Sequence, residues 1–319
     1  MAEPITATGV ASGPEGALVE PSLGSAPAVK GRSLWANAWE ELRRNPLFWI
    51  SSALIVLFVV MAIAPELFTG KDPTFADLRK ARLKPSSEAW FGYDGQGYDV
   101  YARTIYGARA SILVGIFATA FTMVFGSAVG IVAGFFGGWI DGLLSRIGDI
   151  FFAIPLLLGG ILILYTFPST PSTPYLVIVL KVVGAMAIIG WPNLARLMRS
   201  SVLQVKPNDY VQAARALGAR PSRIIVSHIL PNAVAPVIVV STINLGAFIA
   251  TEATLSFLGI GLQPPAISWG LAISDAASIG LIRAAPHMLI FPALFLSLTV
   301  LAFIMLGDAG RDALDPKLR

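Results

Sequence analysis

The sequence contains no cysteine and only two histidines, His228 and His287. The lack of cysteine excludes disulfides, thiolate metal sites and cysteine nucleophiles. Two histidines so far apart in the chain do not suggest a metal site. The sequence also lacks a phosphate-binding glycine loop and a Gly-x-Ser-x-Gly elbow, so we expect no hydrolysis of ATP by this chain and no serine hydrolase chemistry.

Charged residues are scarce. They make up 13% of the 319 residues, whereas 55% are hydrophobic. A soluble domain has a charged fraction of about a quarter, so this composition indicates an all-α polytopic protein surrounded by membrane lipid. The formal net charge is only +4, and the basic residues lie at the ends of apolar segments rather than in a stripe. Nucleic acid is therefore not an expected partner.

The first third of the chain alternates between polar and apolar stretches. Residues 1–32 are rich in Pro, Gly, Ala and Ser without an apolar core, which predicts a disordered cytoplasmic tail rather than a signal peptide. Residues 33–109 then predict three parts. They are an amphipathic lead-in at the membrane surface up to Asn45, a first transmembrane helix over Leu47–Ala64, and a polar extracytoplasmic region over Glu66–Arg109.

Residues 110–308 predict a transmembrane core of five further helices, followed by a charged cytoplasmic tail over residues 309–319. The expected spans are Ala110–Ile140, Ile147–Phe167, Tyr175–Ala195, Val234–Phe257 and His287–Leu306. A short turn containing Asp141 and Arg146 is expected between the first two. Prolines and glycines in Gly259–Pro286 predict a partly buried outer loop instead of another span.

The distribution of basic residues predicts the orientation. Of the 23 Lys and Arg residues, 14 fall in segments assigned to the cytoplasm and 8 in segments assigned to the outside. Basic residues are enriched in cytoplasmic loops, so both termini are expected in the cytoplasm.

Few ionisable residues interrupt the spans, and each has an expected role. Lys181 is close enough to the end of its span to reach the surface. Asp149 has Arg146 three residues earlier as an interfacial partner. Glu252 lies deeper, and we expect either a pathway contact or a structural polar contact there.

Four glycines, Gly126, Gly130, Gly134 and Gly138, recur every fourth residue within the second expected span. Glycines at this spacing fall on one face of a helix and permit close approach of a neighbouring helix in lipid. We therefore expect a packing face here rather than a ligand site.

The charged stretch Pro207–Pro236 interrupts the apolar segments. Asn208 or Asp209 can cap a helix over Tyr210–Leu217, and Gly218 is placed to end it with a left-handed residue. A second short helix should begin near Pro221, with a break at Pro231. Several alanines leave little side-chain bulk, so the loop is expected to be a docking surface for another protein.

The same loop resembles the cytoplasmic signature loop of membrane subunits of ATP-binding-cassette importers. The resemblance rests on Gln212-Ala213-Ala214, Gly218 and Leu230-Pro231. It implies a coupling helix that seats in a groove of an ATPase subunit. Two departures from the family pattern are Gln212, where glutamate is usual, and His228, where an apolar residue is common. The implied coupling residues are Tyr210, Gln212, Ala213, Ala214, Leu217, Gly218, Arg223, His228, Leu230 and Pro231.

Three further stretches narrow the resemblance. Trp90–Arg109, Leu255–Gly270 and Phe291–Arg319 are similar to the C-type membrane subunit of dipeptide and oligopeptide importers. This implies a type I importer permease fold with six transmembrane helices in the bacterial cytoplasmic membrane. It also implies peptide import by alternating access, without catalysis by this chain.

The implied partners are a homologous second permease, two ATPase subunits and an extracytoplasmic solute-binding protein. ATP and Mg²⁺ would be used by the ATPase subunits, and no cofactor is expected on this chain.

Other functions fit the sequence less well. A permease for nickel or another small solute in the same superfamily stays open as the alternative. A channel or secondary transporter would be expected to show paired buried ionisable residues or two similar halves, and neither is found. A membrane enzyme would need a nucleophile beside its base, and no spacing offers one.

Overall fold

The computed structural model describes residues 34–170 and 172–314, so the predictions for residues 1–32 and for the end of the C-terminal tail lie outside the described residues. The described part is helical apart from short 3-10 turns, one π-helical segment, loops and two isolated bridges. The α-helices are α1 (Leu34–Leu42), α2 (Pro46–Ile63), α3 (Val100–Phe136), α4 (Gly138–Phe152), α5 (Leu156–Thr166), α6 (Tyr175–Val205), α7 (Asp209–Ala216), α8 (Pro221–Ile224), α9 (Leu230–Ala233), α10 (Ala235–Phe257), α11 (Trp269–Ala276), α12 (Ile279–Ala284) and α13 (His287–Leu314).

Five of these helices, α2, α3, α6, α10 and α13, are each long and apolar enough to cross a membrane. The helix pair α4 and α5 meets the same test together but is bent by 81°, and counting it as one span gives six. The polytopic all-α prediction is confirmed. The expected third span over Ile147–Phe167 is broken, because Pro155 cannot continue the α4 hydrogen-bond ladder and instead precedes the first residue of α5.

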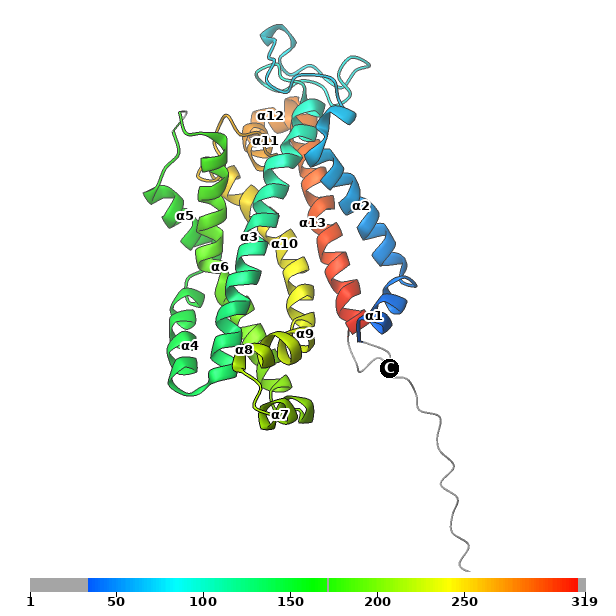
Figure 1. The fold of residues 1–319 in the computed structure, drawn as a ribbon. Helices are drawn as coiled ribbons and strands as arrows, with labels where there is room; N and C mark the ends of the chain where they lie inside the picture. Colours follow the sequence, from blue (N-terminus) through cyan, green and yellow to red (C-terminus); the bar gives the residue numbers. More distant parts are fainter. Residues whose placement is uncertain (1–33, 171, 315–319) are drawn as a thin grey trace, which may run out of the picture. The chain divides into compact units, whose positions relative to one another are not determined.

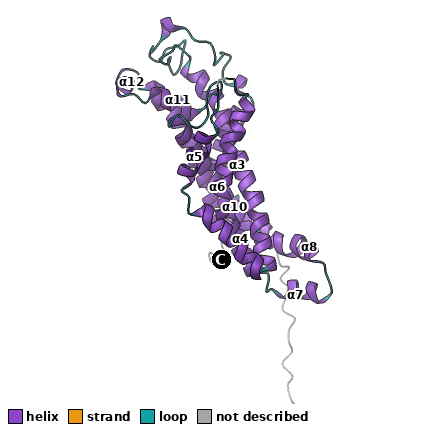
Figure 2. Ribbon diagram, turned by 90° about the vertical axis from the view of Figure 1, so that its left-hand side faces the viewer, coloured by secondary structure: helices purple, strands orange, loops and turns teal. Residues whose placement is uncertain are grey.

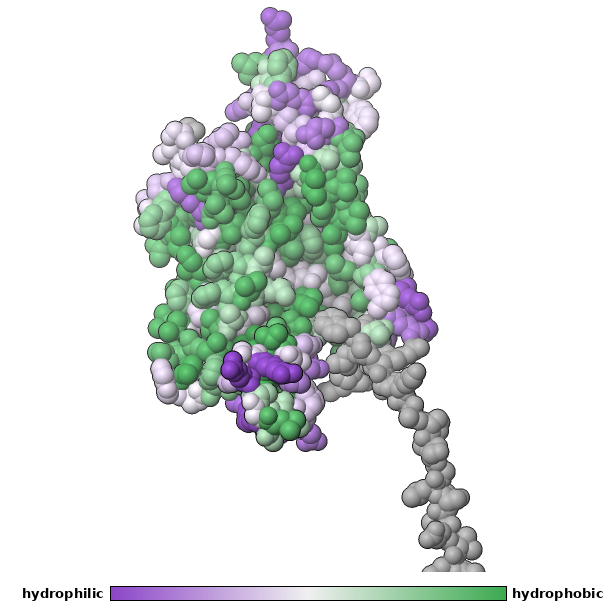
Figure 3. All heavy atoms as spheres, viewed as in Figure 1, coloured by the Kyte–Doolittle hydropathy of each residue, from purple (hydrophilic) through white to green (hydrophobic). Residues whose placement is uncertain are grey.

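The spans form a bundle with two distinct ends (Figure 1). We call the end that carries α7 and α8 the α7 end, and the end that carries α11 and α12 the α11 end (Figures 1 and 2). The C-terminal part of α13 and helix α1 both lie at the α7 end (Figure 1). Figure 3 shows a broad belt of apolar residues between more polar residues at the two ends, as expected for a chain in a bilayer.

Helices α3 and α6 pack closely because three glycines of α3 face α6. A Cβ atom added at Gly130 would lie only 2.4 Å from the carbonyl oxygen of Ala195. Gly126 and Gly134 likewise face backbone and side-chain atoms of α6. The fourth glycine departs from the expectation. Gly138 begins α4 with a positive φ, and a Cβ there would meet nothing.

Several predicted boundaries move because helices run past the apolar segments. α3 begins at Val100 within the predicted extracytoplasmic region, where the carboxylate of Asp99 accepts the N–H of Ala102. α13 continues to Leu314, into the predicted charged tail. Asp141 and Arg146 lie inside α4 instead of in a turn. Polar residues at the ends of spans are thus compatible with continued helix.

The predicted outer loop over Gly259–Pro286 contains α11 and α12 and is partly buried, as expected. Its main anchor is Trp269, which is fully buried and donates its indole N–H to the carbonyl oxygen of Thr104 over 2.8 Å. This bond attaches the start of α11 to the first turns of α3.

Candidate functional site

The loop between α6 and α10 is the best-defined candidate site. Its first helix, α7, ends as the sequence predicts, with Gly218 at φ +77°. The N–H of Gly218 donates to the carbonyl of Arg215 over 3.0 Å, and the N–H of Ala219 donates to that of Ala214 over 3.1 Å. This pair of bonds is the Schellman motif, which satisfies the last carbonyls of a helix and requires a left-handed residue.

The second half of the loop stays helical further than predicted. It runs through α8, a π-helical segment at Ile225–Ile229, and α9. The predicted break at Pro231 is wrong. The N–H of Leu230 donates to Ile225 across the wider π turn, and Pro231 then falls in the first turn of α9, where no donor is needed. The bend lies at Val234 instead.

An apolar cluster holds the loop against the bundle. Val211 of α7 and Ile229 of the π-helical segment are fully buried, together with Met198 and Val202 of α6. Because these side chains pack as one core, a displacement of α7 must be transmitted to α6 or disrupt the packing.

Hydrogen bonds fix the point at which the loop leaves α6. The ammonium of Lys206 donates to the carbonyl oxygen of Phe135 over 2.7 Å and to that of Gly134 over 3.3 Å. A cation at the C-terminal end of α3 also interacts favourably with the helix dipole. The side-chain amide of Gln212 donates to the carbonyl of Lys206 over 3.0 Å. A glutamate carboxylate at position 212 could not make this donation.

The outer face of the loop is open and partly apolar. Leu217 is 88% exposed, Val226 62% and Tyr210 43%. Beside them is a hollow of ≈ 640 Å³, which we call the loop hollow. It is lined by Tyr210, Ala213, Ala214, Leu217, Gly218, Ala219, Arg220, Ser222, Arg223 and His228.

The structure thus brings seven of the ten predicted coupling residues around the loop hollow. The other three lie elsewhere. Gln212 is turned toward Lys206, Leu230 packs partly buried on the apolar cluster, and Pro231 is exposed. The remaining lining residues were missed because they lie in the turn after α7 and in the start of α8, outside the signature pattern; they are Ala219, Arg220 and Ser222.

Two ion pairs join α4 to α6 on the side of the bundle near the α7 end. Arg199 pairs with Asp141, with Nη2 of the arginine 2.6 Å from Oδ2 of the aspartate. Arg196 pairs with Asp149 over 3.1 Å. The expected pairing of Asp149 with Arg146 is wrong, because the partner comes from α6. Local helical spacing could not reveal a partner 47 residues away.

Glu252 is fully buried in α10. Its Oε1 accepts the hydroxyl proton of Ser256 over 2.7 Å, and the hydroxyl oxygen of Ser256 accepts the N–H of Leu262 over 2.9 Å. The carboxyl group thus links α10 to the segment that leads into α11. Of the two roles expected for Glu252, a pathway contact and a structural polar contact, this geometry favours the structural contact.

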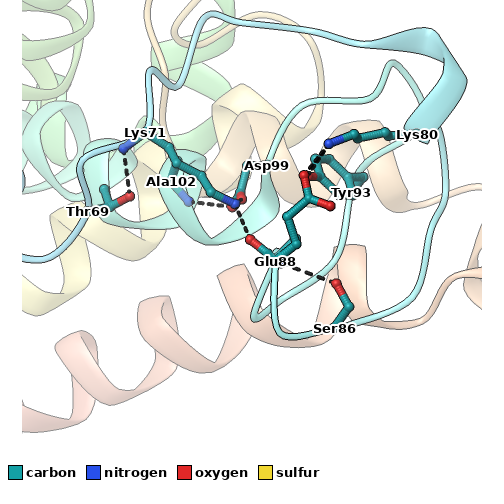
Figure 4. Close-up of polar contacts among 9 residues, drawn as sticks. Thr69, Lys71, Lys80, Ser86, Glu88, Tyr93, Asp99 and Ala102 are labelled. Atoms are coloured by element: carbon teal, nitrogen blue, oxygen red, sulfur yellow. Dashed lines mark hydrogen bonds and ion pairs between the residues drawn. The ribbon is translucent and has the colours of Figure 1, made fainter.

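At the α11 end, residues 64–99 form an ordered polar segment (Figure 4). Lys71 bonds to the Asp99 carboxylate over 2.6 Å and to the carbonyl of Glu88. Lys80 pairs with the Glu88 side chain and lowers the pKa of that carboxyl group, so the pair is fully ionised at neutral pH.

The predicted surface position of Lys181 agrees with its bond to the Pro168 carbonyl over 2.9 Å.

The chain matches two known protein families over different residues. Residues 126–319 match the family described as "Binding-protein-dependent transport system inner membrane component". The chain belongs to this family. Residues 33–85 match the N-terminal TM domain of oligopeptide transport permease C, so the resemblance drawn from the sequence is confirmed at both ends of the permease.

Relatives within this family cover nearly the whole chain. It is 40% identical to the oligopeptide transport system permease protein OppC of Bacillus subtilis, over 91% of this chain and 92% of that protein. It is 39% identical to the dipeptide transport system permease protein DppC of Alkalihalophilus pseudofirmus, over 90% and 91%. It is 36% identical to the glutathione transport system permease protein GsiD of Pectobacterium atrosepticum, over 93% and 97%.

A solved structure shows the same fold. The inward-facing MetNI methionine ABC transporter contains a chain that matches with a TM-score of 0.51 and 21% identity, over 66% of this chain and 95% of that one. The predicted importer permease fold is therefore confirmed. The family also places the chain in the bacterial inner membrane as a multi-pass protein.

Proposed function

We propose that this chain is one permease subunit of an ATP-driven importer that moves peptides across the cytoplasmic membrane by alternating access. The observation that carries the proposal is the nearly full-length similarity to permeases named for oligopeptides, dipeptides and glutathione. All three names denote molecules with peptide-type amide bonds. The sequence itself contains no ATP-binding loop, so the proposal assigns the ATPase activity to separate subunits.

The loop hollow and α7 provide the contact with an ATPase subunit. The exposed Leu217 and Tyr210 supply apolar contacts, and Arg215, Arg220 and Arg223 supply positive charge around them. The cluster around Val211 and the bonds of Lys206 connect this surface to α6 and α3. Closure of an ATPase pair would therefore displace the helices of the bundle rather than a free loop.

The α7 end faces the cytoplasm in this proposal, with both termini on that side. The distribution of basic residues supports this orientation, as does the position of α1 and the end of α13 at the α7 end (Figure 1). The ordered segment at residues 64–99 and helices α11 and α12 then face outward. A solute-binding protein would approach there, and a homologous second permease would complete the pathway.

The proposal can be tested on the intact complex. The chain is expressed with its neighbouring subunits, purified in lipid nanodiscs and analysed by mass spectrometry for subunits and bound ligand. We expect a second permease, ATPase subunits and a peptide carried by the solute-binding protein. Recovery of this chain without any ATPase, or with nickel as the bound ligand, would contradict the proposal.

A further inference from the structure

The break between α4 and α5 lies beside a hollow in the middle of the bundle. The hollow has a volume of ≈ 360 Å³, and we call it the break hollow. It is bordered by the break residues Ile154 and Pro155, by Asn193 of α6 and by Asn244 of α10. Figure 1 shows the break about halfway between the two ends of the bundle, beside α6.

Two residues with side-chain amides line this hollow. Asn193 is exposed and Asn244 half-buried, and neither amide bonds to any residue in 34–170 or 172–314. Each amide carries two donors and one acceptor oxygen. An unpaired amide in contact with lipid is costly, so we expect these groups to meet water or a polar partner.

The break adds further polar groups. Pro155 precedes α5 without a side-chain cap, which leaves N–H groups of the first turn of α5 without an intrahelical acceptor. Irregular backbone at membrane depth is tolerated where it is buried in protein or lines a water-filled cavity. Broken helices with free N–H groups contact polar substrates in other transporters.

The open face of α10 also differs from a lipid-facing surface. Asn244, Ala247, Thr251 and Thr254 follow one another at helical spacings of three and four on the accessible side. These residues are small or polar. On α2, by contrast, the exposed residues include the large apolar Trp49, Ile50 and Val56. Beyond the break hollow, this face of α10 thus carries small or polar side chains.

We infer that the break hollow is the place where this subunit contacts the peptide in transit. Asn193 and Asn244 exchange hydrogen bonds with the C=O and N–H groups of the peptide backbone. Because these groups recur in every peptide, this contact is independent of side-chain sequence. The inference depends on the proposed function and assigns its substrate contact to named residues.

The first test measures water access in a chain that has no native cysteine. Asn193→Cys and Asn244→Cys variants are assembled into the complete complex and treated with a charged, water-soluble methanethiosulfonate. We expect both cysteines to react, and to react more slowly when the transporter is turning over saturating tripeptide. The control variant Val56→Cys, at an exposed apolar position on α2, should not react.

The second test measures transport. Asn193→Leu and Asn244→Leu should each lower ATP-driven tripeptide uptake by roughly fivefold, the factor that corresponds to one neutral hydrogen bond. Asn244→Gln keeps the amide and should retain more uptake than Asn244→Leu. Val56→Leu, at an exposed position on α2 outside both hollows, is the matched control and should keep the wild-type rates of uptake and of basal ATP hydrolysis.

The results separate the two proposals. If the wild-type complex imports no peptide, the proposed function fails, whereas the labelling still reports whether the break hollow holds water. The inference is wrong if peptide is imported but the cysteines at 193 and 244 are inert. It is also wrong if both leucine variants transport peptide at the wild-type rate.

Discussion

Lys206, at the end of α6, connects that helix to α3 and α7 by hydrogen bonds. Its ammonium bonds to the end of α3, and its carbonyl accepts the amide of Gln212 in α7. Hydrogen bonds from a charged donor to carbonyls are stronger than neutral ones, and their loss leaves two partly buried carbonyl oxygens without this donor. This residue therefore stabilises the junction between the bundle and the proposed coupling loop.

Replacement of this lysine should weaken the junction measurably. We expect Lys206→Met to lower the free energy of unfolding by about 1.5–3 kcal/mol, because the variant keeps the aliphatic stem but loses the charged donor. Thermal unfolding of the purified chain in detergent provides the measurement. Lys84→Met, at an exposed position in the outer segment, is the matched control and should unfold at the wild-type temperature.

Gly218 is the second position at which one residue controls the loop. A Cβ at this residue would meet no atom within 4 Å, so the cost of a side chain comes from the left-handed backbone alone. Gly218→Val should cost about 1–2 kcal/mol locally and redirect α8. We expect basal ATP hydrolysis to survive while peptide-stimulated hydrolysis and uptake fall together.

Two variants serve as controls for this measurement at equal amounts of inserted protein. Gly218→Asn should retain activity better than valine, because asparagine tolerates the left-handed region. His228→Ile should be tolerated, since it moves the loop toward the commoner apolar pattern. Peptide import by Gly218→Val at the wild-type rate would show that this loop does not couple ATP hydrolysis to transport.

At the scale of elements, close packing of α3 on α6 is the feature most sensitive to volume. Gly130→Leu should disrupt it, because even the first added atom would lie 2.4 Å from the carbonyl oxygen of Ala195. We expect a lower yield of assembled complex and a lower unfolding temperature. Gly142→Leu, at an exposed position of α4 with nothing near the added Cβ, should assemble normally. An unchanged yield for Gly130→Leu would mean that this packing is dispensable.

The sequence predicted the elements that depend on local rules. The end of α7 at Gly218 follows from helix capping, and the fifth span follows from a predominantly apolar run in which Glu252 is the one charged residue. The bend between α4 and α5 could not be read from composition, because Ile147–Phe167 is apolar apart from Asp149 and Thr166 and a proline is also tolerated within a membrane-spanning helix. The extension of α6 to Val205 was missed because Arg196 and Arg199 are paired with acids of α4.

The candidate functional residues also divide into those that the sequence predicts and those that it does not. The residues around the loop hollow are close in sequence and carry a recognisable pattern, so most could be named in advance. Asn193 and Asn244 come from two helices and border a bend of a third. No local pattern marks them, because their importance depends on the tertiary arrangement of three separate segments.

At the scale of the whole molecule, orientation in the membrane is the property to establish. We expect residues 200–228 to face the cytoplasm and residues 66–99 to face outward. Single cysteines at Ser227 and Ser87, labelled with a membrane-impermeant thiol reagent in intact cells and in inverted vesicles, would report the side of each. Labelling of position 87 only in inverted vesicles would reverse the orientation.

The central claim is that this chain transports peptides when its α7 end is engaged by ATPase subunits. The most direct measurement is the uptake of a radiolabelled tripeptide by proteoliposomes containing the complete complex and its binding protein. The account predicts accumulation that requires hydrolysable ATP on the side of the α7 end and falls in the Gly218→Val complex. ATP hydrolysis without peptide accumulation, or peptide uptake indifferent to ATP, would contradict it.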